Sequence, residues 1–281
     1  MSWRLRIRHT TGYRYDTEVR ASYNEARLTP QTGPAQLTLE SSVQTTPPAR
    51  QQRYWDYWGT QVTSFDLSTA HRELEVTAVS VVETADPSPQ PLGATWELLR
   101  SEAVTDAHVE MLTPSARTVP GDDLVAVAAE AVEGLDPQDA ALTLVRLVHQ
   151  EVAYRTGSTG VSTSASEAWR QRSGVCQDIA HVSIALLRAV GIPARYVSGY
   201  LHPGGEQAPL GETVRGESHA WIEAWLGDWW AFDPTNDIPV GERHVVVARG
   251  RDYADVPPLK GVYSGGTASA LDVTVDMTRL A

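Results

Sequence analysis

The sequence has one cysteine, no long apolar run and fewer positive than negative charges. A single cysteine among 281 residues excludes an internal disulfide and any cysteine-cluster zinc or iron–sulfur site. The 23 Lys and Arg against 35 Asp and Glu give a net charge of −12, which disfavours binding to nucleic-acid phosphates. No stretch approaches 18 consecutive apolar residues, so we expect neither a transmembrane helix nor a membrane partner.

The N-terminus also lacks the apolar segment of a signal peptide. The basic stretch Met1–Arg8 is not followed by an apolar run. A lone cysteine without an export signal is typical of the cytoplasm, where thiols stay reduced. We therefore expect a cytoplasmic protein.

The first part of the chain is predicted to form strands. Trp3, Leu5 and Ile7 alternate with arginines, which is the two-residue period of a half-buried strand. Similar alternation continues to about residue 85, with Pro and Gly between the runs. Residues 1–85 are therefore predicted to be a β-rich domain.

A proline-rich segment follows, and the hydrophobic period changes after it. Residues 85–91 contain three prolines within five positions, which favours an extended, semi-rigid linker. No clear period continues to about residue 120. The predicted division is a β-rich domain at 1–85, a linker and irregular connection at 86–121, and a second domain with a C-terminal tail at 122–281.

Helix signals dominate the start of the second domain. Asp136 is predicted to be a helix N-cap, with Pro137 at the first helical position. Ser164 and Glu167 have the spacing of a capping box at the start of another helix. A helix apolar on most sides is predicted from Cys176 to about residue 190, ended by a glycine. Strands are predicted at 196–200, 219–225 and 229–232, so this domain belongs to the α+β class.

Cys176 stands where a reactive thiol is expected. Free cysteines are usually buried and inert, and a structural cysteine would fit best in the middle of the apolar helix. Cys176 instead opens the helix, two positions after Gly174, which lets the backbone turn tightly. The unpaired N–H groups and dipole of a helix N-terminus favour thiolate over thiol and can hold a developing oxyanion. Cys176 is therefore the candidate nucleophile.

A thiol nucleophile needs a base and a group that orients the base. His219 begins one predicted strand, and Asp233 ends the next. Direct opposition of the two requires a three-residue loop, Trp225–Gly227, with Gly227 at its left-handed third position. A two-residue loop at Gly227–Asp228 would instead turn the two side chains to opposite faces. The sequence permits the first register without excluding the second.

Aromatic residues near these positions are weaker candidates for substrate binding. Tyr154 and Trp169 precede Cys176 in the chain, and Trp221 shares a predicted strand face with His219. Each could line a cleft, and each could equally be a core residue. Asp178 is interpreted as a favourable acidic residue in a first helical turn, and no acidic cluster matches a calcium loop.

Several motifs together resemble the transglutaminase-like core superfamily. They are Gly174–Asp178, Leu186–Arg195, His219–Trp221 and Phe232–Thr235. The N-terminal segments Ile7–Tyr15 and Asn24–Pro30 and the later Gly250–Pro258 are similar to a bacterial subfamily with a β-rich N-terminal domain. The resemblance implies a papain-like, transglutaminase-core cysteine domain preceded by an all-β domain.

The resemblance also implies a chemistry. It assigns a catalytic triad to Cys176, His219 and Asp233, without cofactor or metal. The thiolate attacks an amide carbonyl and forms a thioester, which passes to water or to an amine. The expected partners are amide-containing peptides, proteins or small molecules. Hydrolysis is the first expectation, and a cross-linking transglutaminase or a non-catalytic binding or scaffold module are the alternatives.

Overall fold

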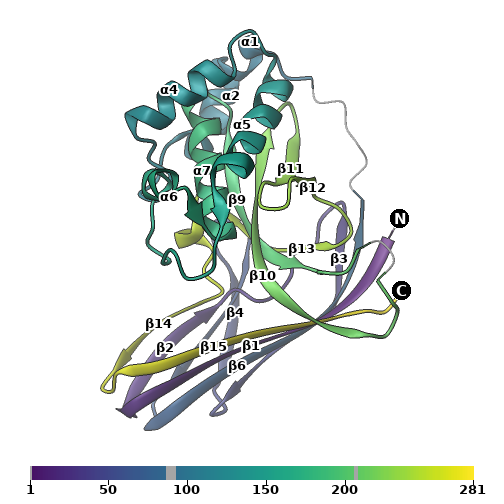
Figure 1. Cartoon of the computed structure of the whole chain (residues 1–281). Helices are drawn as coiled ribbons and strands as arrows, with labels where there is room; N and C mark the ends of the chain where they lie inside the picture. Colours follow the sequence, from purple (N-terminus) through teal and green to yellow (C-terminus); the bar gives the residue numbers. More distant parts are fainter. Residues whose placement is uncertain (1, 87–92, 206–207) are drawn as a thin grey trace.

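Strands from both ends of the chain build the larger sheet of the computed structural model, which describes residues 2–86, 93–205 and 208–281. The sheet is antiparallel, and β10 joins its two halves (Figure 1). In order, the strands are β12 (Ile238–Pro239), β11 (Trp229–Asp233), β10 (Thr213–Trp225), β15 (Ala268–Arg279), β1 (Ser2–Val19), β6 (His71–Ala85) and β3 (Gln36–Thr46); β9 (Ala194–Leu201) also pairs with β10, and β13 (His244–Gly250) pairs with β9.

The C-terminal strands belong to the β-rich part of the molecule. Figure 1 shows β15, at the yellow end of the chain, beside the purple β1. A smaller sheet likewise places β14 (Leu259–Ser264) beside β2 (Ala21–Ala26), followed by β5 (Gln61–Leu67) and β4 (Gln51–Trp55). The predicted division placed these C-terminal residues in the second domain, whereas their backbone groups find hydrogen-bond partners in the first.

The apolar and charged residues that alternate along β1 lie on opposite faces of the strand, as predicted. Trp3, Leu5 and Ile7 are at most 2% exposed, while the arginines between them are exposed. These three side chains pack in the same core cluster as Leu144 and Ile179, which lie on helices of the second domain. The first strand is therefore part of the core that supports the helices. A separate cluster fills the interior of the β-rich part.

The helices lie over one half of the larger sheet (Figure 1). No helix in the described ranges is both long enough and apolar enough to cross a membrane. Part of the segment predicted as an irregular connection forms three short helices, and most of the proline-rich linker lies outside the described residues. The helices are α1 (Trp96–Leu99), α2 (Glu102–Ala107), α3 (Val109–Leu112), α4 (Asp122–Ala131), α5 (Pro137–Glu151), α6 (Ala165–Gln171) and α7 (Cys176–Ala189), with a short 3₁₀ turn η1 (Tyr253–Asp255).

The predicted helix starts are confirmed. Asp136 accepts hydrogen bonds from the first-turn N–H groups of α5, and Ser164 with Glu167 forms the capping box of α6. After α7, Gly191 has a φ of +86°, a conformation that glycine adopts without strain. With its β-rich N-terminal region and mixed helix–strand core, the molecule has the predicted α+β class.

Candidate active site

Cys176 is the first residue of α7, and Asp178 shapes the turn that leads into it. The Asp178 Oδ2 atom accepts a hydrogen bond from the Val175 N–H at 2.8 Å and one from the Thr159 hydroxyl at 2.5 Å. Gly174 leaves room for this carboxyl group, since a Cβ there would lie 2.6 Å from the Asp178 Cβ. Burial raises the pKa of Asp178. The entry to the helix is therefore held by a buried side chain.

The N-terminus of α7 gives the Cys176 sulfur a polar environment. The two short strands before α6 and α7, β7 (Ala153–Tyr154) and β8 (Ser173–Gly174), pair with each other and hold the chain just before the helix. The N–H groups of Cys176 and Gln177 are in the first helical turn, where no preceding turn supplies an acceptor. They are available to an oxygen atom beside the sulfur.

His219 reaches the same place from β10, through a hairpin whose register differs from the prediction. Trp225 pairs with Trp229, so the connecting loop is Leu226–Asp228. Gly227, with a φ of +97°, occupies its middle position, and Leu226 is fully buried. The loop has the predicted three residues, but it lies one residue later. The predicted direct opposition of His219 and Asp233 is therefore wrong.

The two side chains nevertheless meet. Continuing the observed register places Asp233 opposite Trp221, two positions along β10 from His219. Because the pairing moved by two positions, both side chains stay on the same face of the hairpin. The His219 Nε2 atom lies 2.7 Å from the Asp233 Oδ2 atom, a diagonal contact across the two strands.

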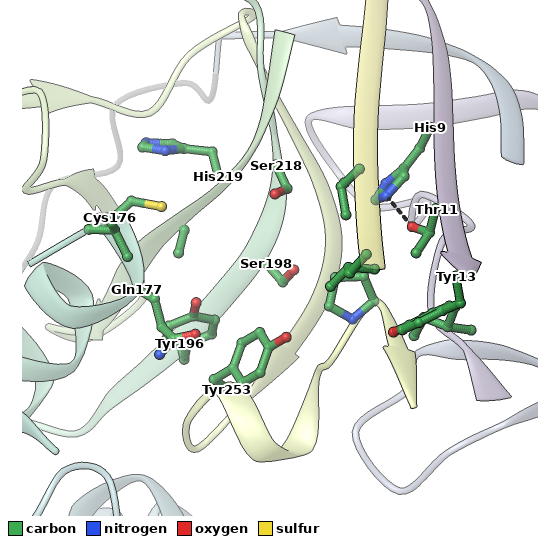
Figure 2. Close-up of a pocket in the computed structure, with 16 residues that line it drawn as sticks. His9, Thr11, Tyr13, Cys176, Gln177, Tyr196, Ser198, Ser218, His219 and Tyr253 are labelled. Carbon is green, nitrogen blue, oxygen red and sulfur yellow. Dashed lines mark hydrogen bonds between the residues drawn. The ribbon is translucent and has the colours of Figure 1, made fainter. Parts of the chain in front are cut away.

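The electrostatics of His219 favour its protonated form. Burial by itself would lower the pKa of this imidazole. Hydrogen bonding to Asp233 and Cys176, together with their negative charge, outweighs burial and raises the pKa of His219 to about 10. Figure 2 shows Cys176 and His219 next to each other at one end of a cavity. The imidazole of His219 is therefore held in its protonated form beside Cys176.

Asp233 is fully buried and accepts hydrogen bonds on both oxygens. The N–H groups of Thr235 and Asn236 donate to Oδ1 at 3.0 and 3.2 Å. The Asn236 side chain donates to Oδ2 at 2.7 Å, in addition to the imidazole of His219. Burial would raise the pKa of Asp233, but these donors hold it well below its ordinary value. Asp233 is therefore an anion in a fixed position.

His244, on β13, is a second imidazole on the same carboxylate. The Gly241 N–H donates to its Nδ1 atom at 3.2 Å, so the proton of the neutral ring is on Nε2. That Nε2 lies 3.3 Å from the Asp233 Oδ2 atom. Sequence analysis gave no role to His244 or Asn236. The short spacing from Asp233 was the available signal for Asn236, whereas only the pairing of β13 with β9 places His244.

The cavity beside Cys176 has a volume of about 250 Å³ and lies between the second domain and the β-rich part. Side chains of β1 and β15 form the wall away from Cys176, which Figure 2 shows on its right. The lining residues are His9, Thr11, Tyr13, Val175, Cys176, Gln177, Tyr196, Ser198, Ser218, His219, Ala220, Tyr253, Pro258, Leu259, Leu271 and Val273.

The three aromatic residues proposed for substrate binding are outside this lining. Trp169 is 4% exposed and packs under the Arg172 guanidinium. Trp221 is fully buried, and its ring meets that of His244 edge-on at 5.3 Å. Both are core residues behind the site. Tyr154 is 48% exposed, and burial and the charge of Cys176 raise its pKa, so it lies near the thiol outside the cavity.

Metal-binding arrangements are absent from the part of the chain that the structure describes. There, no group of three or more His, Cys, Asp or Glu side chains is placed to hold a metal ion. A thiol, an imidazole and a carboxylate in contact can generate a nucleophile and move one proton.

Family comparisons match two regions of the chain. Residues 5–83 match the bacterial transglutaminase-like N-terminal region, and residues 126–234 match the transglutaminase-like superfamily. An uncharacterized protein of Mycobacterium leprae is 48% identical over 99% of this chain and 100% of its own length. Another, of Mycobacterium tuberculosis, is 35% identical over 98% of this chain and 92% of its own length.

Two further proteins are similar to this chain, one over about a third of its length and the other over nearly all of it. A protein-glutamine gamma-glutamyltransferase of Pseudomonas aeruginosa is 37% identical over 108 residues, which are 35% of this chain and 15% of that protein. The crystal structure of a Cytophaga hutchinsonii protein, described provisionally as a cysteine protease, has a TM-score of 0.78 at 23% identity. The likeness covers 99% of this chain and 98% of that one, and it shows a shared fold.

Proposed function

This chain belongs to the transglutaminase-like superfamily, with the N-terminal region of its bacterial members, and from that premise we propose that it is a cysteine-dependent amide hydrolase. Cys176 is the nucleophile, and His219 acts as the acid and the base. Asp233 orients the imidazole of His219 and stabilises its protonated form. One observation carries the proposal. The buried Asp233–His219 contact of 2.7 Å points the imidazole to a thiol at a helix N-terminus, on the wall of a cavity.

The proposed reaction follows from these positions. The Cys176 thiolate adds to the amide carbonyl carbon, and the carbonyl oxygen becomes an oxyanion that the N–H groups at the start of α7 can accept. His219 holds Asp233 through Nε2, so Nδ1 is the nitrogen left to give its proton to the departing amine. The C–N bond breaks and a thioester remains on Cys176.

Hydrolysis completes the cycle. The now neutral His219 takes a proton from water, whose oxygen attacks the thioester carbonyl. The carbon–sulfur bond breaks, the acid leaves, and the thiolate–imidazolium pair returns. Asp233 stays ionised throughout and stabilises the imidazolium each time it forms. Water is the default acceptor because nothing in the proposal requires the site to exclude it.

Cross-linking is the second candidate. The similarity to a gamma-glutamyltransferase over 108 residues favours it, because transfer to an amine uses the same thioester. The two activities differ only in the group that attacks second. A non-catalytic binding or scaffold module is a third possibility on this fold. The contact between His219 and Asp233 argues against it, because binding alone does not need a charged pair beside a thiol.

One experiment separates these candidates. The protein and its Cys176→Ala variant are incubated with a library of peptide amides, with and without methylamine, and acyl groups on Cys176 and the products are identified by mass spectrometry. Hydrolysis predicts a thioester on Cys176 and a carboxylic acid product without added amine. Products that form only with methylamine favour cross-linking. Equal product from the Ala variant, or no acyl-enzyme with any amide, contradicts the proposed function.

A further inference from the structure

The wall of the cavity away from Cys176 is built by two strands from opposite ends of the chain. Thr11 pairs with Val273, and Tyr13 pairs with Leu271, across β1 and β15. All four side chains line the cavity. Directly paired residues of adjacent strands point to the same side of a sheet, so the four form one patch that faces the thiol. Figure 2 shows His9, Thr11 and Tyr13 on this side.

This wall carries no formal charge. Charged residues make up 21% of the chain, yet no Asp, Glu, Lys or Arg is among the sixteen lining residues. His9 is held between two hydroxyl groups, with Nδ1 2.9 Å from the Tyr200 oxygen and Nε2 3.0 Å from the Thr11 oxygen. Burial lowers the pKa of His9 to about 4, so its ring is neutral near pH 7.

The strand period explains where the charges of these two strands lie. On β15, Asp272 and Asp276 occupy the positions that alternate with Leu271, Val273 and Val275. On β1, Arg8 and Arg14 alternate in the same way with the cavity-facing residues. Side chains at alternate positions of a strand point to opposite faces. The sheet therefore directs its ionic groups away from the cavity on this side.

The remaining lining combines hydroxyl groups with apolar side chains. Ser198, Ser218 and Tyr253 contribute hydroxyl groups, which both donate and accept hydrogen bonds. Leu271 and Val273 are 59% and 44% exposed, which is open apolar surface beside those hydroxyls. An amide or hydroxyl group finds partners in such a lining. Against the β1–β15 wall, a carboxylate or ammonium group would lose water without gaining an opposite charge.

We propose that the β1–β15 wall is the binding subsite for the acyl part of the substrate, and that it selects an uncharged chain bearing amide or hydroxyl groups. The identity of the ligand as an acyl donor rests on the function proposed above. The selection against charge is a property of the wall itself, and it can be measured without turnover.

Three matched alkylating probes test this selection, because each reacts with Cys176 and carries a different tail into the cavity. They are the iodoacetyl derivatives of glycinamide, glycine and ethylenediamine, with neutral, anionic and cationic tails. Each inactivation rate constant is divided by the rate constant of the same probe with 2-mercaptoethanol. The neutral probe is expected to react about tenfold faster than either charged probe.

Substitutions at Val273 test whether the wall is responsible. Val273→Asp is expected to raise the ratio of the cationic to the anionic rate about tenfold, and Val273→Lys to lower it about tenfold, because each puts a charge on the wall. Thr274→Asp and Thr274→Lys are the controls: they change the net charge equally but lie at the alternate position of β15. Their ratios are expected to change less than about twofold, since solvent and salt screen the more distant charge.

The outcomes decide the proposal. Equal normalised rates for the three probes overturn it, as do shifts at Thr274 as large as those at Val273. If a Val273 variant does not fold, as judged by circular dichroism, the same pair of substitutions at the more exposed Leu271 replaces it. If the charge selection holds and no amide is turned over, the subsite stands and the proposed hydrolase activity fails.

Discussion

Asp233 and His219 are the residues whose ionisation the fold changes most clearly at the site. The pKa of His219 rises from 6.5 to about 10, so its contribution to stability is complete below pH 6.5 and is lost as the pH rises towards 10. The pKa of Asp233 falls below 3.8, so its contribution is present above pH 3.8 and is lost as the pH falls further. The pair therefore stabilises the protein most between these two ordinary values.

Asp233→Asn tests this window. The difference in free energy of unfolding between the native protein and the variant is expected to be largest between pH 3.8 and 6.5, and to shrink towards pH 10. Urea unfolding across this pH range measures it. The variant is also expected to lose about 10³–10⁴-fold in kcat with the amide substrates, since the imidazolium loses its counter-charge. A stability difference that does not change with pH would contradict the ion pair.

His244 is expected to act as a positioning residue, because it donates to the same Asp233 oxygen as His219. His244→Phe leaves that oxygen with one donor fewer and is expected to lower kcat about tenfold, with little effect on KM. His244→Gln retains an N–H donor and is expected to recover most of the rate. Equal rates for both variants would show that His244 only fills space. ¹⁵N chemical shifts of His244 provide an independent check, since the protein geometry requires the proton on Nε2.

At the scale of elements, the start of α7 depends on one buried carboxyl group. Asp178→Ala removes the acceptor of the Val175 N–H and the Thr159 hydroxyl. We expect a loss of about 1–2 kcal/mol in stability and a slower alkylation of Cys176 by iodoacetamide, because the helix entry that places the sulfur is no longer held.

Asp136→Ala is the matched control, since Asp136 caps α5 in the same way through the N–H groups of Gln138 and Asp139. It is expected to cost a similar free energy of unfolding, with unchanged alkylation of Cys176. Slower alkylation in both variants, in proportion to their stability, would reduce the role of Asp178 to that of an ordinary helix cap.

The β10–β11 hairpin shows which features of a loop local sequence patterns predict and which they do not. The sequence permitted two registers, and the structure adopts a three-residue loop that contains Gly227 and keeps His219 and Asp233 on one face. The position of the loop did not follow from the sequence, because Leu226 is drawn into the core and Trp225 pairs with Trp229. Burial of a large apolar side chain outweighed the usual place of glycine in such loops. Because the observed pairing differs from the predicted one by two positions, His219 and Asp233 still lie on the same face of the hairpin and remain in contact.

At the scale of the whole molecule, the N-terminal strands and the helices share one core. Trp3, Leu5 and Ile7 pack in the cluster that includes the apolar face of α7. A truncated protein that begins at residue 93 loses these side chains and leaves β15 without β1. We expect it to be insoluble or to lack a cooperative thermal transition. A soluble protein with the melting temperature and Cys176 alkylation rate of the full chain would contradict this shared core.

The sequence by itself determined the local parts of this protein. Hydrophobic periodicity and capping residues, which act over a few positions, predict four features of the molecule. These are the α+β class, the start of α7 at Cys176, the caps at Asp136 and Ser164, and the buried face of β1. The candidate nucleophile followed in the same way, because a helix N-terminus is a local feature.

Only the tertiary structure decided the rest. The pairing of β15 with β1 and β10, the hydrogen bond from His244 to Asp233, and the uncharged wall opposite Cys176 join residues far apart in the chain. Strand periodicity specifies which face of a strand is buried but not which strand lies beside it. That choice depends on which backbone edges and apolar faces remain to be covered once the whole chain has folded, and no local pattern records it.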